Sequence, residues 1–258
     1  MADRLRYKIS FVVQVMDGFR NMPVQGKQVS VFIEGEKPPI QKEGGYFVFV
    51  NLSTSQFNVQ IEGDAFLKKV EQVNLEEAAE KYGFLKVYMI PDNRYPIPAG
   101  TTCIEGKAAK GSKITLLFWK GLRPFQLLED YIKDSAQTDK LRMFAPENSE
   151  LDGRQFYIEN KGEKTGEFFY VARSEELRTN EYRLESPLNN NYDRIGTNIY
   201  VVYTTYVNEK ESFFFPVMVT GEASCDVICE TIDGTRISKW IPLQTGVVNQ
   251  IKFEEEER

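Results

Sequence analysis

The chain contains no histidine. This absence excludes Ser-His-Asp and Cys-His catalysis, the histidine-ligated zinc hydrolases and the facial triads of non-haem iron enzymes, because each of them needs an imidazole. The chain also lacks a glycine-rich dinucleotide fingerprint, a P-loop, a Gly-x-Ser-x-Gly elbow and an EF-hand spacing. We therefore expect no catalytic residues, no cofactor and no metal site, and we interpret the protein as a non-enzyme.

Cysteine is scarce, with only Cys103, Cys225 and Cys229. A small odd number does not make a disulfide framework and fits a reducing compartment. In a strand, Cys225 and Cys229 would lie about 13 Å apart, which is beyond the reach of a disulfide. We expect three buried thiols that pack as small hydrophobic side chains. A three-cysteine metal site is the minor alternative.

Long hydrophobic runs are absent as well. The N-terminus is charged and its longest apolar run covers only residues 11–13, so we expect neither a signal peptide nor a transmembrane span. The net charge of −6 argues against a general binder of nucleic acids or anionic membranes, which normally has a basic face. We expect a protein that is cytoplasmic at synthesis, and a component of a released particle would share these features.

Segments in which apolar and polar residues alternate dominate the sequence. The chain is 41% hydrophobic, which suffices for packed cores. Alternation predicts strands over residues 7–15 and 29–33. Gly44 and Gly45 predict a turn, and the apolar run at residues 46–50 is typical of a strand covered on both faces. Residues 56–63 follow as a half-buried strand, because every second residue is apolar.

Two segments have helical signals. Residues 74–83 have a capping Asn74, an acidic first turn and Gly83 at the expected C-terminal position. Residues 124–133 place Leu127, Tyr131 and other apolar side chains at helical spacing. We expect the second helix to cover a sheet edge or the open end of a sandwich, with a docking face for a partner as the alternative.

Three prolines within eight residues predict an extended linker after the first strands. We place a first domain at residues 1–93, the linker at 94–100 and a second β-rich region at 101–258. That region is either one large β domain or two sandwiches that divide near residues 190–195. Within it, Pro216 indicates an edge strand or a bulge, Asp233 and Gly234 a hairpin turn, and residues 254–257 a solvated acidic tail.

Four stretches in the first third of the chain form a recognisable pattern: Val15-x-Asp17, Pro23-Val24-x-Gly26-x-x-Val29-x-Val31, Gly45-Tyr-Phe-x-Phe-x-Asn51-Leu52 and Phe57-x-Val59-x-Ile61-x-Gly63-x-x-Phe66. In these stretches the chain resembles the carboxypeptidase regulatory-like (transthyretin-like) β-sandwich family. The resemblance implies a β-sandwich that serves as an accessory unit, and it implies no peptidase chemistry. We expect an all-β fold of tandem β-sandwich domains, transthyretin- or immunoglobulin-like, with one or two short helices.

These features favour a non-enzymatic structural or adaptor protein. The layout, with its Tyr95-Pro-Ile-Pro-x-Gly-Thr-Thr linker, is similar to accessory β-sandwich proteins of phage-tail-like contractile injection particles. That resemblance implies protein partners in a larger bacterial assembly, a homo-oligomer among the options, and no binding of nucleic acid or insertion into a membrane.

Two alternatives stay open. One is a carbohydrate- or surface-binding module, in which Trp119, Tyr157 or Trp240 stacks on sugar rings, although core packing is the favoured role for each. The candidate binding residues are Trp119, Tyr131 and Trp240. The other alternative is a β-sandwich glycoside hydrolase, which would need two carboxylates about 5–10 Å apart.

Overall fold

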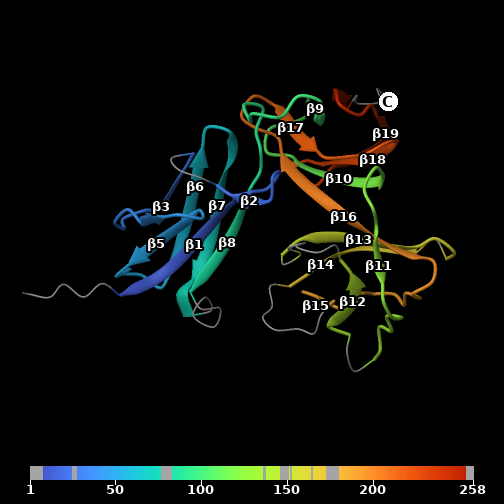
Figure 1. Cartoon of the computed structure of the whole chain (residues 1–258), viewed down its shortest axis with the longest axis horizontal. Helices are drawn as coiled ribbons and strands as arrows, with labels where there is room; N and C mark the ends of the chain where they lie inside the picture. Colours follow the sequence, from blue (N-terminus) through green and yellow to red (C-terminus); the bar gives the residue numbers. More distant parts are fainter. Residues whose placement is uncertain are drawn as a thin grey trace, which may run out of the picture.

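The structure is a computed structural model, and it describes residues 8–24, 28–76, 83–135, 138–145, 151, 153–163, 165–172 and 180–253. Within these residues twenty strands make up almost all of the regular structure (Figure 1). Helical backbone occurs in the described part only at residues 75–76. The all-β class is therefore confirmed.

Strands β1–β8, the N-terminal strand group, form two sheets. The five-stranded sheet contains β1 (Ile9–Asp17), β2 (Met22–Pro23), β4 (Ile40–Lys42), β5 (Tyr46–Val50) and β8 (Phe84–Met89). A three-stranded sheet contains β3 (Val29–Ile33), β6 (Gln56–Gly63) and β7 (Phe66–Asn74) in that order. Strand β1 is central in the larger sheet, because it pairs antiparallel with β5 and parallel with β8.

One hydrophobic core lies between these two sheets. Val13 on β1 and Val59 on β6 are both fully buried and belong to the same cluster. The predicted alternation is thus confirmed for residues 11–15, 29–33 and 57–61, whereas Ile9 is 65% exposed and Tyr7 lies outside the described residues. The expectation that β5 is covered on both faces is wrong for the described residues, since Phe47 and Phe49 are buried whereas Tyr46 is 36% exposed. The apolar residues of β5 on the second face remain at the surface.

The predicted helix at residues 74–83 lies mostly outside the described residues, as does the acidic tail at 254–257. At its start, the Asn74 side-chain oxygen accepts the Glu76 N–H at 3.1 Å, the contact expected of a capping residue. At its end, Gly83 has φ of +60°. This left-handed conformation suits glycine.

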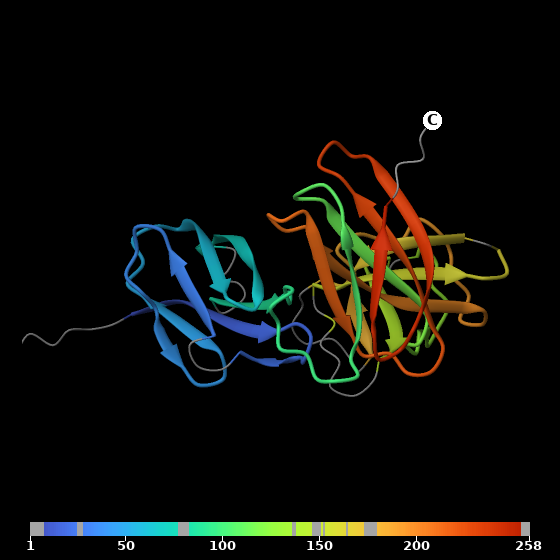
Figure 2. The ribbon, with the colours of Figure 1, turned by 90° about the horizontal axis from the view of Figure 1, so that it is seen from above.

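Strands β9–β20, the C-terminal strand group, form two further sheets, and both views show this group beside the first (Figures 1 and 2). The smaller sheet contains β17 (Ser212–Val217), β9 (Thr102–Lys107) and β20 (Val248–Lys252), in that order. The nine-stranded sheet contains β10 (Lys113–Lys120), β11 (Phe125–Leu127), β12 (Lys140–Phe144), β13 (Gln155–Asn160), β14 (Thr165–Tyr170), β15 (Glu181–Arg183), β16 (Thr197–Tyr206), β18 (Ala223–Glu230) and β19 (Arg236–Leu243).

Strand β16 joins the two halves of the nine-stranded sheet. Its first half pairs with β13 on one side and β11 on the other, whereas its second half pairs with β10. Three core clusters lie along it, the smallest of which contains Tyr200 and Val202 of β16 with Leu117 of β10. The two larger clusters lie at its two ends. One contains Ile114 of β10 and Ile104 of β9, and the other contains Phe156 of β13 and Ile199 of β16.

The predicted helix at residues 124–133 is wrong. Phe125 and Leu127 are both buried in β11, which pairs with β12 and β16. Tyr131 then forms an isolated bridge with Tyr192, while Ile132 is 49% exposed. The apolar residues at helical spacing therefore do not share one buried face. The edge-strand prediction from Pro216 is confirmed, because β17 pairs only with β9 among the described strands.

Tyr95, in the predicted linker, packs into the N-terminal core. Its ring lies against Phe19 and Phe66 with centroids 5.8 and 5.4 Å apart. Its hydroxyl donates a hydrogen bond to the buried carboxylate of Asp17, which also accepts the N–H groups of Phe19 and Arg20. These contacts hold the start of the connection against the β1–β2 turn, and the domain boundaries themselves stay a prediction.

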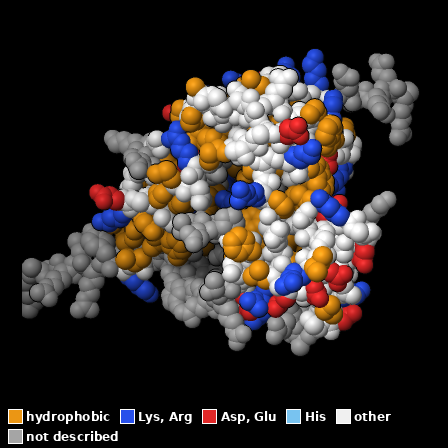
Figure 3. Space-filling view, turned by 45° about the vertical axis from the view of Figure 1, so that its right-hand side comes forward, with side chains coloured by type: hydrophobic (Ala, Val, Ile, Leu, Met, Phe, Trp, Pro, Cys, Tyr) orange, Lys and Arg blue, Asp and Glu red, His pale blue; other side chains and the backbone are white. Residues whose placement is uncertain are grey.

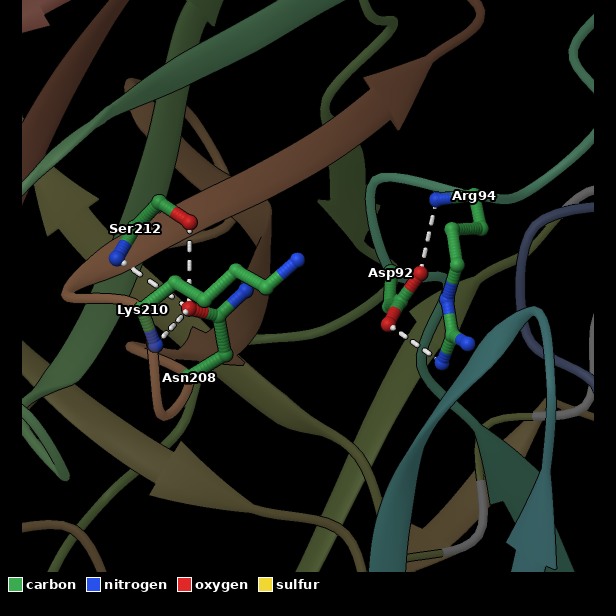
Figure 4. Close-up of polar contacts among 5 residues, drawn as sticks. All are labelled: Asp92, Arg94, Asn208, Lys210 and Ser212. Atoms are coloured by element: carbon green, nitrogen blue, oxygen red, sulfur yellow. Dashed lines mark hydrogen bonds and ion pairs between the residues drawn. The ribbon is translucent and has the colours of Figure 1, made fainter.

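Side-chain oxygens order the turns near this connection (Figure 4). Asp92 accepts the N–H of Arg94 at 2.7 Å, and the Arg94 guanidinium lies 3.3 Å from its other oxygen. In the turn between β16 and β17, the Asn208 side-chain oxygen accepts three hydrogen bonds, from the N–H of Lys210 and from the N–H and hydroxyl of Ser212. These contacts fix where β17 begins.

Candidate functional site

A cleft of about 540 Å³ lies between the two strand groups. The N-terminal group contributes the β1–β2 turn and the end of β8, and the C-terminal group contributes β16, β17 and the segment that leads into β13. Hydrophobic and basic side chains surround this middle part of the molecule (Figure 3). A concave site of this size between two structural units is typical of a binding site.

All charged side chains among the described lining residues of this cleft are basic. Lys69, Lys113 and Arg154 line it, and none of its described lining residues is Asp or Glu. Lys69 is compensated, because its ammonium lies 3.0 Å from a carboxylate oxygen of Glu71. In the described part of the chain Lys113 and Arg154 form no ion pair. These two cations make the described lining of the cleft net positive in a chain of net charge −6.

Arg154 connects the two walls of the cleft. Its guanidinium carbon lies 5.5 Å from the ring centre of Tyr88 on β8, a cation–π distance. Arg154 directly precedes β13, so the strand positions it at the edge of the C-terminal group. The contact holds the guanidinium at the mouth of the cleft.

Tyrosines supply the other polar groups. Burial raises the pKa of Tyr203, which the nearby Arg154 opposes, and burial also raises the pKa of Tyr170. Both phenols therefore keep their protons at neutral pH and can donate hydrogen bonds. The Tyr203 ring packs against Phe118 and Phe215, with centroids 5.7 and 5.2 Å apart, so the floor of the cleft is part of a core.

Trp119 lies outside the lining of the cleft, on the face of the nine-stranded sheet that carries the small cluster of Leu117, Tyr200 and Val202. Its indole N–H donates to the Asp226 carboxylate at 2.9 Å. Its ring meets Tyr157 and Tyr200 edge to face, with centroids 5.8 and 5.1 Å apart. Trp119 and Tyr157 are thus partly buried against neighbouring rings, the packing role that the sequence favours.

Trp240 is the exposed member of this face. It lies on β19 directly opposite Asp226, and 59% of it is exposed. Tyr131 is elsewhere: it is 5% exposed, its hydroxyl donates to the Thr138 carbonyl at 2.8 Å and accepts the Leu188 N–H at 2.9 Å. The structure therefore places Trp119 and Trp240 beside the same residue, Asp226, whereas Tyr131 lies in a core.

The sequence gives no signal for the cleft. Arg154, Lys113 and Tyr88 are far apart in the chain and belong to no motif. The pairing of β10 and β13 with β16 brings Lys113 and Arg154 together, and the packing of the two strand groups adds Tyr88 of β8. Their residue types are common at surfaces. A search of the sequence alone does not distinguish them from other basic and aromatic side chains.

The thiols are unsuited to surface chemistry. All three cysteines are free and buried, and burial raises the pKa of Cys103 to about 11 and that of Cys225 to about 12. No group of three or more His, Cys, Asp or Glu side chains that could hold a metal ion occurs among the described residues. No helix in the described part of the chain has the length and apolar character to span a membrane.

Neither a scan against protein-family models nor a search of curated proteins finds a match to the chain.

Proposed function

We propose that this chain is a non-enzymatic adaptor or structural component of a larger assembly, built from tandem β-sandwich domains. The N-terminal strand group is the docking module in this proposal, and the outer face of its five-stranded sheet is the surface that meets a protein partner. Accessory β-sandwich modules act through rigid faces and edges of this kind.

An apolar row across that sheet carries the proposal. The register places Ile40 of β4 beside Val48 of β5, Val48 beside Val12 of β1, and Val12 beside Phe84 of β8. Ile40 and Phe84 are 44% and 38% exposed, and Val12 and Val48 are partly buried. A contiguous apolar surface that crosses four strands is typical of an interaction site.

The next row of the same face indicates the chemistry of the partner. It consists of Lys42, Tyr46, Gln14 and Lys86, in register across the same four strands. Lysines at the two ends of an otherwise uncharged row favour a partner with an apolar centre and acidic side chains at its rim. A subunit of a phage-tail-like contractile particle is the partner that the resemblance of the layout suggests.

The test introduces a charge into the row. Ile40→Asp and Phe84→Asp place a carboxylate where the partner must exclude water, so we expect the fraction of protein that co-migrates with native particles in size-exclusion chromatography to fall about tenfold or more. Ile232→Asp is the matched control, because Ile232 is 83% exposed in a hairpin of the C-terminal group. Co-migration that survives both changes on the row, or a wild type that never co-migrates, would reject the proposal.

A carbohydrate-binding module is the second candidate, and the exposed Trp240 beside Asp226 favours it. A flat indole can stack on a sugar ring while a carboxylate accepts its hydroxyl groups. A glycan array with wild type, Trp240→Ala and Trp240→Phe decides it. Binding that the alanine abolishes and the phenylalanine partly retains would replace the adaptor proposal.

A further inference from the structure

We infer that the cleft between the two strand groups binds an extended acidic peptide, which adds as a strand to the second half of β16. The inference rests on β16, Arg154 and Lys113, not on the apolar row of the five-stranded sheet. A negative result for the cleft therefore leaves the docking face untouched, and the reverse also holds.

The backbone edge is the first observation. Strand β16 pairs with β13 only as far as Val201, while β10 occupies its opposite side from Val202 to Tyr206. Among the described strands, the side of β16 that β13 leaves at Val201 has no partner over residues 202–206. Val202, Tyr203, Thr204 and Tyr206 all line the cleft. An unpaired strand edge presents alternating N–H and C=O groups, which an extended chain can satisfy.

The charges are the second observation. Arg154 lies just before β13, next to the point where pairing with β16 stops, and Lys113 pairs with Tyr206 at the far end of the edge. Four residue steps separate Val202 from Tyr206, about 13 Å of strand. The two cations without ion pairs thus bracket the free edge. Acidic side chains of a bound segment would meet a cation at each end.

The strand edge itself favours a peptide over a small anion. Its N–H and C=O groups need both acceptors and donors, and a peptide backbone supplies both, whereas a fully ionised small anion supplies no donor. An acidic peptide satisfies the cations and the strand edge together.

A labelled, alternating Glu-Val hexapeptide is the probe, and fluorescence anisotropy with the full-length protein is the measurement. We expect saturable binding that weakens as salt rises, because the cations attract the carboxylates. The matched Lys-Val hexapeptide should not bind. A Glu-Val peptide with alternate amides N-methylated should bind at least about fivefold more weakly, because it loses donors for the strand edge.

Charge changes locate the site. Lys113→Glu and Arg154→Gln should each weaken binding about tenfold, while Lys133→Glu, at an exposed position outside the cleft, should leave it unchanged. Since Arg154 also contacts Tyr88, thermal unfolding of each variant is compared with wild type, and Lys113→Glu tests the site without changing that contact. Absence of peptide binding, equal binding of the basic peptide, or binding that neither change at Lys113 or Arg154 weakens would overturn the inference. Saturable binding of inorganic phosphate without any peptide binding would do the same.

Discussion

Glu167 is a partly buried carboxylate that holds a loop through a dense set of hydrogen bonds. Its oxygens accept the backbone N–H groups and the side-chain amides of Asn189 and Asn190, and the hydroxyl of Tyr192 at 3.0 Å. Burial raises the pKa of Glu167, but these hydrogen bonds outweigh burial, so the pKa is lower than its ordinary value. The ionised form is therefore the one that the fold stabilises.

We expect Glu167→Gln to lower the free energy of unfolding by about 1–3 kcal/mol at pH 7, because the amide offers one acceptor where several donors converge. The folded-state pKa lies below that of the unfolded chain. The carboxylate therefore stabilises the fold above about pH 4.3, and this contribution is lost as the pH falls through the lowered value. Urea unfolding of wild type and variant at pH 7 and pH 3 checks both points.

The exposed Glu163→Gln is the control at this scale. It should leave the unfolding free energy unchanged at either pH, because its side chain is exposed and makes no hydrogen bond or ion pair within the described part of the chain. A gap between Glu167→Gln and wild type that is equally large at pH 3 and pH 7 would contradict the role of ionisation.

At the scale of the element, Gly45 shows how one residue fixes the entry to a strand. It has φ of +73°, its carbonyl accepts the Val15 N–H at 2.9 Å, and a Cβ built on it would lie 2.5 Å from the Val15 carbonyl oxygen. Gly35 has a similar φ of +78° but open space around it. Alanine substitutions at the two glycines therefore distinguish the cost of backbone strain alone from the cost of strain with steric overlap.

We expect Gly45→Ala to cost about 2–4 kcal/mol, since it adds a clash to the strain of a left-handed backbone. Gly35→Ala should cost about 1 kcal/mol, the strain alone. Chemical denaturation of both variants measures the difference. Equal costs would show that β1 and β5 move apart freely at this turn.

Strand β11 shows why a local sequence pattern can predict the wrong secondary structure when pairing with distant strands determines it. Residues 124–133 carry apolar side chains at helical spacing, yet Phe125 and Leu127 also alternate, and β16 and β12 supply partners for a strand on both sides. A segment this short has little helical stability of its own. By contrast, the long alternating patterns of β1 and β6 are compatible only with strands, and the structure has strands there.

At the scale of the whole molecule, the sequence predicts well which residues are buried. It predicts poorly which residues from distant parts of the chain contact one another. The class, the buried thiols and the edge position of Pro216 follow from residue types and spacing. The cleft does not, because Arg154 and Lys113 come together only through the order of strands around β16. Strand order depends on pairings across long stretches of chain, which no local pattern encodes.

The two strand groups share no backbone ladder among their described strands, and no hydrophobic cluster contains buried residues of both. We therefore expect the intact chain to unfold in two calorimetric transitions. Phe49 and Phe118 are each 1% exposed, one in each group, and Phe49→Ala or Phe118→Ala should cost about 3–5 kcal/mol through a cavity. Each change should lower the melting temperature of one transition and leave the other in place, because a cavity weakens only the core that contains it. A single transition that both changes lower equally would mean that contacts across the cleft, such as Arg154 on Tyr88, couple the groups into one cooperative unit.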